Sequence, residues 1–386
     1  MAQGEQGPMT TGVCNIEDVA GAFGVDERHA MALGSLGDLL ARSGYGEFVG
    51  HFGPLSPDPQ RWRSHAPNAP PALKPLLDLF LLNRDVSADR LPPELHALLP
   101  TLIELSLVTR AGDGMLGLDG LVLLAVLGTW LFCDPPQADA DFYLGEDSMA
   151  LLTRMTPVAG GEALDLCAGP GLHALHAARF SRRVVAVERD AAAARLARIN
   201  ADLNRLGDRV LVLQGDLYAP IAGQCFDTIT ANPPWLPYPP GLRPPAIGDG
   251  GRDGLRLVRR IISGLAPALK DGGTAQIVGM TWSDGRLPLA CEELRALSAS
   301  SSLDLRITTL SHLALDDSGA FLGHWLRTLC AVSGETVANC HAAMMGLIAD
   351  AKATHLCSFF LGARPGRGRF ETVDLSGSPR SSSWYL

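Results

Sequence analysis

The spacing of apolar residues changes near residue 142. Before this point, apolar residues recur at helical spacing in three segments: 16–46, 72–83 and 92–105. Two short apolar runs around Ala111–Gly114 then predict a β-hairpin. Helices followed by such a hairpin suggest a winged-helix-like layout for this part of the chain.

After residue 142, short β-branched runs alternate with helical stretches rich in Ala, Leu and Arg. The runs are Ala163–Cys167, Arg183–Val187, Val210–Gln214, Phe226–Ala231, Thr274–Gly279, Asp304–Leu310 and His355–Leu361. Strands that alternate with helices indicate a parallel sheet with helices on both faces. We therefore predict an α/β fold: a doubly wound, seven-stranded Rossmann-like sheet with a smaller, mainly helical N-terminal domain.

These patterns divide the chain into two domains, with the polar, Pro-containing segment 134–141 as the linker. We place a flexible tail at 1–15, the N-terminal domain at 16–138, the α/β domain at 139–376 and a second flexible tail at 377–386. The candidate helix in 92–105 has no basic stripe, so we expect the N-terminal domain to act as a substrate lid or in dimerisation rather than on DNA.

Composition narrows the class of protein. The 386 residues are 47% hydrophobic, and the net charge of −9 disfavours a protein that grips a nucleic-acid backbone. The longest apolar stretch, Gly120–Cys133, is 14 residues, whereas a membrane span needs about 20. The eight cysteines include no C-x-x-C pair, so the sequence indicates neither a metal site nor a redox dithiol. Without a recognisable signal peptide, we expect a cytoplasmic protein with no membrane contact.

The first strand of the α/β domain runs into a glycine loop. Gly169 and Gly171 remove side chains that would keep a ligand from the backbone before the next helix. Seventeen residues after Gly171, the next strand ends in Glu188, whose carboxylate can accept hydrogen bonds from ribose hydroxyls. Taken alone, this pattern fits a nicotinamide dinucleotide as well as S-adenosylmethionine.

Three carboxylates favour the second ligand. Asp165 precedes the glycines, Glu188 ends the second strand and Asp216 follows the third. They suit an ammonium, a ribose and an adenine amino group, but not a diphosphate. Pro170, between the glycines, also lacks the amide that a pyrophosphate-binding turn would use.

The fourth strand runs directly into Asn232-Pro233-Pro234-Trp235. The two prolines remove amide donors, so the Asn232 side-chain oxygen and the Pro233 carbonyl become paired acceptors at the carboxyl edge of the sheet. Two acceptors that face one point can hold an NH₂ group. Trp235 adds a flat face for a planar group or a cation.

With this corner, the sequence resembles the class I S-adenosylmethionine-dependent methyltransferases of the HemK/PrmC type over about residues 142–282. Glu146-Asp147-Ser148 and the stretch 248–273 carry further similarity. The resemblance implies S-adenosylmethionine as cofactor and Asn232, Pro233, Pro234 and Trp235 as catalytic residues. It implies cofactor contacts from Ser148, Asp165, Cys167, Ala168, Gly169, Pro170, Gly171, Glu188, Arg189, Asp216, Leu217 and Asn232.

The methyl acceptor stays open at this stage. We expect N-methylation of an amine, amide or guanidine of a small molecule, an amino acid or a secondary metabolite in a biosynthetic reaction, with Tyr143, Trp235 and Tyr238 as substrate contacts. The alternative is a macromolecule, either an rRNA or tRNA base or a protein side-chain amide. A third hypothesis is a non-catalytic DNA-binding regulator. A nucleic-acid partner is disfavoured, and a homodimer is left open.

Overall fold

The computed structural model describes residues 23–52, 58–137, 140–243, 248–316, 320–377 and 382–384. The predicted tail 1–15 lies outside these residues. So does the predicted domain boundary between residues 138 and 139.

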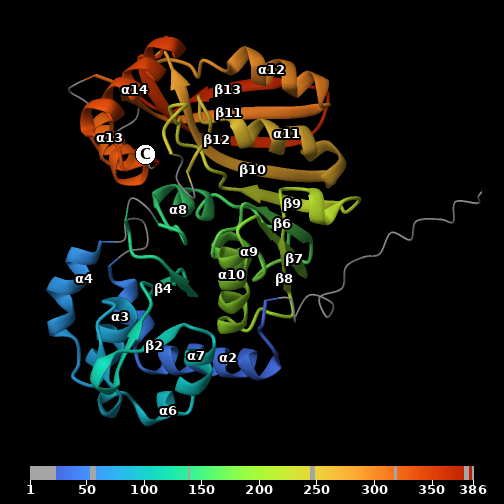
Figure 1. Ribbon diagram of the computed structural model, residues 1–386. Coiled ribbons are helices and arrows are strands. Elements are labelled where there is room, and N and C mark those ends of the chain that lie inside the picture. Colours follow the sequence, from blue (N-terminus) through green and yellow to red (C-terminus); the bar gives the residue numbers. More distant parts are fainter. Residues whose placement is uncertain are drawn as a thin grey trace, which may run out of the picture.

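An eight-stranded sheet forms the centre of the molecule, in the order β13-β11-β12-β10-β9-β6-β7-β8 (Figure 1). β12 runs antiparallel to both of its neighbours, and the other pairs are parallel. The strands are β6 Glu162–Leu166, β7 Arg183–Glu188, β8 Val210–Gln214, β9 Phe226–Ala231, β10 Leu269–Ser283, β11 Leu303–Ala314, β12 His355–Pro365 and β13 Phe370–Asp374. The doubly wound sheet is confirmed, and β13 adds an edge strand to the seven predicted.

Helices cover both faces of this sheet. Successive strand residues face opposite sides, so Ala163 belongs to one apolar core and Leu164 to the other. The helices on the Ala163 side are α8 Glu146–Leu152, α9 Leu172–Ala177 and α10 Ala191–Leu203; those on the Leu164 side are α11 Arg256–Ala268 and α12 Cys291–Ser300. Strands buried on both faces explain the nearly continuous apolar runs of the sequence.

The N-terminal region contains helices and two small sheets. The helices are α2 Glu27–Arg42, α3 Tyr45–Gly50, α4 Pro59–His65, α5 Lys74–Leu76, α6 Pro93–His96 and α7 Leu99–Glu104. β2 Val108–Arg110 and β3 Met115–Leu118 form the predicted hairpin, with β1 Val86–Ser87 on its edge. The apolar stretch 120–133 is a second hairpin, of β4 Val122–Val126 and β5 Thr129–Cys133. Leu127 and Gly128 make its turn, both at positive φ.

Two asparagines, one in the last turn of α10 and one at its C-cap, attach this hairpin to the α/β part. The Asn200 side chain accepts from the Phe132 amide at 2.9 Å and donates to the Phe132 carbonyl at 3.0 Å. Asn204 makes the same pair of bonds to Trp130, at 2.8 and 2.7 Å. Each amide group thus pairs with β5 as a neighbouring strand would. The two parts also share one continuous apolar core.

Two further helices and the C-terminal residues complete the molecule. α13 Ala320–Ser333 and α14 Val337–Ala351 follow β11 and precede β12, and they lie beside the sheet on the same side of the view as the N-terminal region (Figure 1). Trp384 is buried, with 4% of its surface exposed, which differs from the flexible tail predicted for 377–386. Within the described ranges, no helix has the length and apolar character that a membrane crossing requires.

Candidate active site

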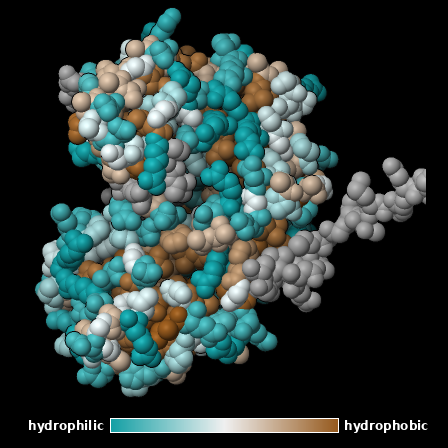
Figure 2. Space-filling model, in the orientation of Figure 1, coloured by the Kyte–Doolittle hydropathy of each residue, from teal (hydrophilic) through white to brown (hydrophobic). Residues whose placement is uncertain are grey.

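A cavity of about 300 Å³ opens where β6, β7, β8 and β9 reach their carboxyl ends. From β6 the chain continues to β7 on one side, whereas β9 pairs with β6 on the other. Ligands of open α/β sheets bind at such a switch in strand order. The space-filling view shows the surface hollowed between the part that carries α13 and α14 and the N-terminal region (Figure 2).

Most of the predicted site residues line this one cavity. They are Tyr143, Ser148, Cys167, Ala168, Gly169, Pro170, Glu188, Arg189, Asp216, Leu217, Asn232, Pro233, Pro234 and Trp235. Segments separated by more than 80 positions in the sequence therefore meet as the motifs indicated. Three predicted residues, Asp165, Gly171 and Tyr238, do not line it.

Asp165 lies behind the cavity wall, which differs from its expected place at the rim. Its carboxylate accepts from Thr230 Oγ1 at 2.8 Å and from the Ala174 amide at 3.1 Å. Only 1% of the residue is exposed, and burial raises the pKa of its carboxyl group. Asp165 thus joins β6, β9 and the start of α9 and supports the glycine loop from below.

Gly171 and Tyr238 also have structural positions. Gly171 is the N-cap of α9 at φ 93°, a left-handed conformation that favours glycine, and a Cβ added there would also come within 3.2 Å of the Ala197 Cβ. Tyr238 is buried, and its hydroxyl donates to the Arg243 carbonyl at 2.5 Å.

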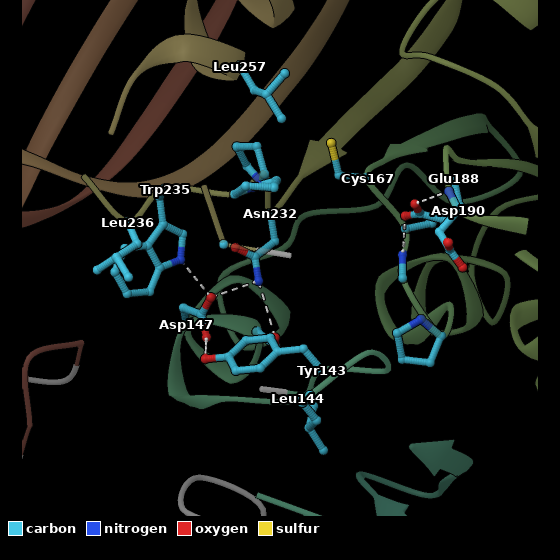
Figure 3. Close-up of a pocket in the computed structure, with 18 of the residues that line it drawn as sticks. Tyr143, Leu144, Asp147, Cys167, Glu188, Asp190, Asn232, Trp235, Leu236 and Leu257 are labelled. Atoms are coloured by element: carbon cyan, nitrogen blue, oxygen red, sulfur yellow. Dashed lines mark hydrogen bonds between the residues drawn. The ribbon is translucent and has the colours of Figure 1, made fainter. Parts of the chain in front are cut away.

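Glu188 is held in place by two backbone amides. Its Oε2 accepts from the Gly169 amide at 2.9 Å, and its Oε1 accepts from the Asp190 amide at 2.8 Å (Figure 3). Each carboxylate oxygen retains lone pairs for a second donor, which two vicinal hydroxyls of a ribose could supply. The site at the β7 end therefore fits a nucleoside.

Two non-glycine residues beside Glu188 and Asp216 adopt left-handed backbone conformations. Cys167 has φ 57° and Leu217 has φ 51°, and both line the cavity. Such conformations cost free energy and concentrate at ligand sites. Burial raises the pKa of the Cys167 thiol, so this cysteine lines the cavity as a neutral group.

Asp147 gathers three hydrogen bonds at the other end of the cavity. Asn232 Nδ2 donates to its Oδ2 at 3.0 Å, Trp235 Nε1 donates to the same oxygen at 2.9 Å, and the Tyr143 hydroxyl donates to Oδ1 at 2.7 Å (Figure 3). Asp147 is 1% exposed. Burial of the Tyr143 hydroxyl and the neighbouring Asp147 carboxylate raise the pKa of Tyr143. The hydroxyl therefore stays protonated and donates.

The side-chain oxygen of Asn232 has no matching partner. Asn232 Nδ2 donates to Asp147 and, at 3.2 Å, to Ser148 Oγ, whereas Oδ1 is buried without a hydrogen-bond partner among the residues that the structure describes. A carboxylate only accepts, so Asp147 fixes the orientation of the amide. One acceptor beside the cavity is thus left for a donor that arrives with a ligand.

Trp235 is packed against the C-terminal segment. Its ring lies 5.7 Å from the Trp384 ring, centroid to centroid, at an interplanar angle of 64°. Arg154 Nη2 donates to the Trp384 carbonyl at 3.0 Å, and the Ser358 hydroxyl donates to the Ser383 carbonyl. This packing supports one edge of the NPPW corner.

Several lining residues were not predicted. Asp147 was visible only as part of the acidic segment Glu146-Asp147-Ser148, and Asp190 and His173 follow motif residues closely. His173 Nε2 donates to the Ser148 carbonyl at 2.9 Å. Another wall comes from α13, through Phe321, His324, Trp325 and Thr328. No local motif marks these four residues, because only tertiary packing brings α13 to the cavity.

Comparison with known proteins agrees with this geometry. Residues 143–284 match the family model of the methyltransferase small domain. A "Putative protein N5-glutamine methyltransferase" of Methanocaldococcus jannaschii is 33% identical over 138 residues, 34% of this chain and 68% of that protein. A release factor glutamine methyltransferase of Moorella thermoacetica is 37% identical, over 32% of this chain and 47% of the relative. A ribosomal protein uL3 glutamine methyltransferase of Bradyrhizobium diazoefficiens is 36% identical, over 36% and 47%.

Solved structures of low sequence identity resemble the chain more distantly. Trm5b of Pyrococcus abyssi shares 14% identity with a TM-score of 0.37, over 66% of this chain and 62% of that chain. The T. thermophilus 16S rRNA N2 G1207 methyltransferase shares 21% identity with a TM-score of 0.32, over 48% and 53%. The fold assignment rests on the strand order described above.

The strand order, the cavity and the matched family model place the chain among the S-adenosylmethionine-dependent methyltransferases. More narrowly, the chain belongs to the HemK/PrmC-like group of class I methyltransferases, and its cofactor is S-adenosylmethionine. The chain spans about half the length of the relatives from Moorella and Bradyrhizobium and about two thirds of the one from Methanocaldococcus.

The expectation of a small-molecule substrate was wrong. It rested on the acidic net charge and on a first domain unlike that of the family. The curated relatives are instead named for methylation of glutamine in release factors and in a ribosomal protein. Net charge describes the whole surface, whereas the identity of the acceptor depends on a few atoms at the cavity.

Proposed function

We propose that this protein transfers a methyl group to the side-chain amide nitrogen of a glutamine in a protein substrate. The observation that carries the proposal is the buried, unpartnered Oδ1 of Asn232, in the part of the chain that the structure describes. An oxygen in that position accepts from an NH₂ group. The curated names of the relatives, which specify glutamine, favour an amide as the bearer of that group.

One end of the cavity would bind the cofactor, and the other end would bind the substrate amide. Glu188 would accept from the ribose hydroxyls and Asp216 from the adenine amino group, while the Gly169-Pro170-Gly171 turn lets the cofactor approach the backbone. Bound there, S-adenosylmethionine supplies an electrophilic methyl group on a sulfonium sulfur. Asp216 is half exposed and paired with Arg260 at 2.7 Å, so its carboxylate is oriented before the ligand arrives.

Asn232 and the Pro233 carbonyl would hold the two hydrogens of the substrate NH₂ group and thereby direct its lone pair toward the methyl group. The nitrogen lone pair would form the new N–C bond, the sulfonium would supply the methyl group and leave as a thioether, and one N–H proton would be released to solvent. The hydrogen bonds to both oxygens strengthen as positive charge develops on the nitrogen, because its N–H groups become better donors. Trp235 covers the acceptor and helps to exclude water.

A partition experiment tests the proposal. The purified protein is incubated with methyl-labelled S-adenosylmethionine and a bacterial cell extract, and the label is counted in protein, RNA and small-molecule fractions. We expect the label in protein with the wild-type chain and none above background with Asn232→Ala. Label that enters only RNA or only the small-molecule fraction would overturn the proposed function.

A further inference from the structure

A second buried polar atom beside the cavity also has no partner. Trp325 of α13 is 1% exposed and lines the cavity, and its indole Nε1 makes no hydrogen bond within the described ranges of the chain. Buried N–H groups in folded proteins are nearly always satisfied, so an exception beside a ligand cavity calls for an explanation. The methyl-transfer step described above does not use this donor.

Trp325 lines the same cavity as Asn232 and Trp235, and a chain of contacts joins it to the NPPW corner. Its ring lies 5.7 Å from the ring of Trp282. Trp282 Nε1 donates to the Arg252 carbonyl at 2.9 Å. The loop that contains Arg252 is bound to the residues after the NPPW corner, because Leu236 donates to the Gly248 carbonyl and Tyr238 to the Gly251 carbonyl, both at 2.8 Å. These contacts tie α13 to the corner that holds Asn232.

The two unpartnered atoms are opposite in kind. Asn232 Oδ1 is an acceptor and Trp325 Nε1 is a donor that cannot accept. A primary carboxamide carries both complements, an NH₂ donor and a carbonyl acceptor, on one planar group. An ammonium or guanidinium group offers only donors, and a carboxylate offers only acceptors. The pair therefore matches a carboxamide better than any of the other three groups.

We infer that Trp325 donates its indole N–H to the carbonyl oxygen of the substrate carboxamide and makes the site specific for amides. This inference rests on the proposed function and assigns a residue to the recognition of its substrate. A hydrogen bond to the carbonyl is present both before and during methyl transfer, so it acts on substrate binding more than on the rate of the bound complex. Sites built to bond a polar group reject analogues that lack it.

Indole N–H resonances test the contact without turnover. The chain has six tryptophans, and the Trp325 resonance is assigned by its loss in Trp325→Phe. The ¹⁵N-labelled protein, loaded with S-adenosylhomocysteine, is titrated with N-acetylglutamine methylamide. We expect the Trp325 resonance to shift downfield, while that of Trp282, already bonded to Arg252, stays in place. N-acetylornithine methylamide, which replaces the amide by an amine, should leave both unchanged.

The contact is overturned if the Trp325 resonance stays in place at the highest soluble amide concentration, or if the amine shifts it equally. The titration needs no knowledge of the natural substrate.

Kinetics give the second readout. Trp325→Phe keeps an aromatic ring against Trp282 but removes the donor. The substrate is the protein that takes up label in the cell extract. For Trp325→Phe, we expect the KM for this substrate to rise about tenfold over wild type, the size of one lost hydrogen bond. We expect kcat to stay within about twofold of the wild-type value. Trp62→Phe, in α4 of the N-terminal region, is the matched control and should change neither value.

The two proposals fail differently in this assay. If the wild-type chain methylates a protein amide but Trp325→Phe keeps its KM, only the role of Trp325 is refuted. If the wild-type chain labels no protein, the proposed function fails and the inference fails with it.

Discussion

Asp147 determines what Asn232 can offer a substrate. Three donors converge on its carboxylate, and one of them is the Asn232 amide nitrogen. An amide bound through its nitrogen on one side presents its oxygen on the other. A residue absent from the predicted site thus orients the one that the NPPW motif identified.

Loss of Asn232 should affect the rate more than cofactor binding. In Asn232→Ala, we expect kcat to fall about 10²-fold or more, because an acceptor that stabilises charge on the nitrogen is removed. The dissociation constant for S-adenosylmethionine, measured by calorimetry, should change by less than about threefold. Unchanged turnover would show that the NPPW corner takes no part in methyl transfer.

Loss of Glu188 should instead affect cofactor binding. Glu188→Ala removes the predicted ribose contact and frees the amides of Gly169 and Asp190. We expect no measurable binding heat with S-adenosylmethionine. Glu162→Ala, at the amino end of β6 where Glu162 pairs with Lys270 at 2.7 Å, is the matched control and should bind normally. Near-normal affinity in Glu188→Ala would show that the ribose site lies elsewhere.

Strand alternation explains why Asp165 was predicted at the wrong place. Asp165 pairs with Ala186 and Thr230 inside the ladder, so its side chain points to the face that α9 covers. On β6, the last paired position is Leu166, and the lining residues begin after it, at Cys167. The sequence showed the strand and its carboxylate, but not the position at which the ladder stops.

At the scale of elements, the predicted strands were found in order, whereas the walls of the cavity were not foreseen. β13 is short and mostly exposed, so its sequence lacks the apolar run that marked the other strands. α13 is apolar on most of its surface, and such a segment indicates burial without indicating against what. The two tryptophans at positions 325 and 384 acquire their roles only through packing.

The Trp384 contact should matter for the NPPW corner. Trp384→Ala removes the ring that supports Trp235, whose indole N–H in turn bonds Asp147. We expect kcat to fall about three- to tenfold, with little change in the affinity for S-adenosylmethionine. Trp384→Phe should recover most of the rate, because a smaller aromatic ring still packs there. Full activity of Trp384→Ala would show that the Trp384 ring is not needed to support the NPPW corner.

At the scale of the whole molecule, the N-terminal region is joined to the cavity through α10. Asn200 bonds both Phe132 of β5 and, at 2.9 Å, the carbonyl of Pro170 in the glycine loop. The division into domains at 138 stays a prediction. Asn200 nonetheless supplies a direct connection between the β4–β5 hairpin and the loop that would face the cofactor.

Two asparagine variants separate stability from cofactor binding. Asn200→Ala leaves buried backbone groups of Phe132 and Pro170 unpaired, so we expect the free energy of unfolding to fall by about 3 kcal/mol in urea titrations. The affinity for S-adenosylmethionine should fall as well. Asn204→Ala should also lower stability, but it has no bond to Pro170 and should keep that affinity. Equal affinities in both variants would contradict the connection.

The position of the transferred methyl group is the most direct test of the proposed chemistry. The protein is incubated with S-adenosylmethionine that carries a trideuterated methyl group and with the proteins of a cell extract, and the products are mapped by tandem mass spectrometry. We predict the heavy methyl on a glutamine side-chain nitrogen with the wild-type chain, and on no residue with Asn232→Ala. A heavy methyl on lysine, arginine or a nucleobase, formed equally by both proteins, would contradict delivery of an amide by Asn232.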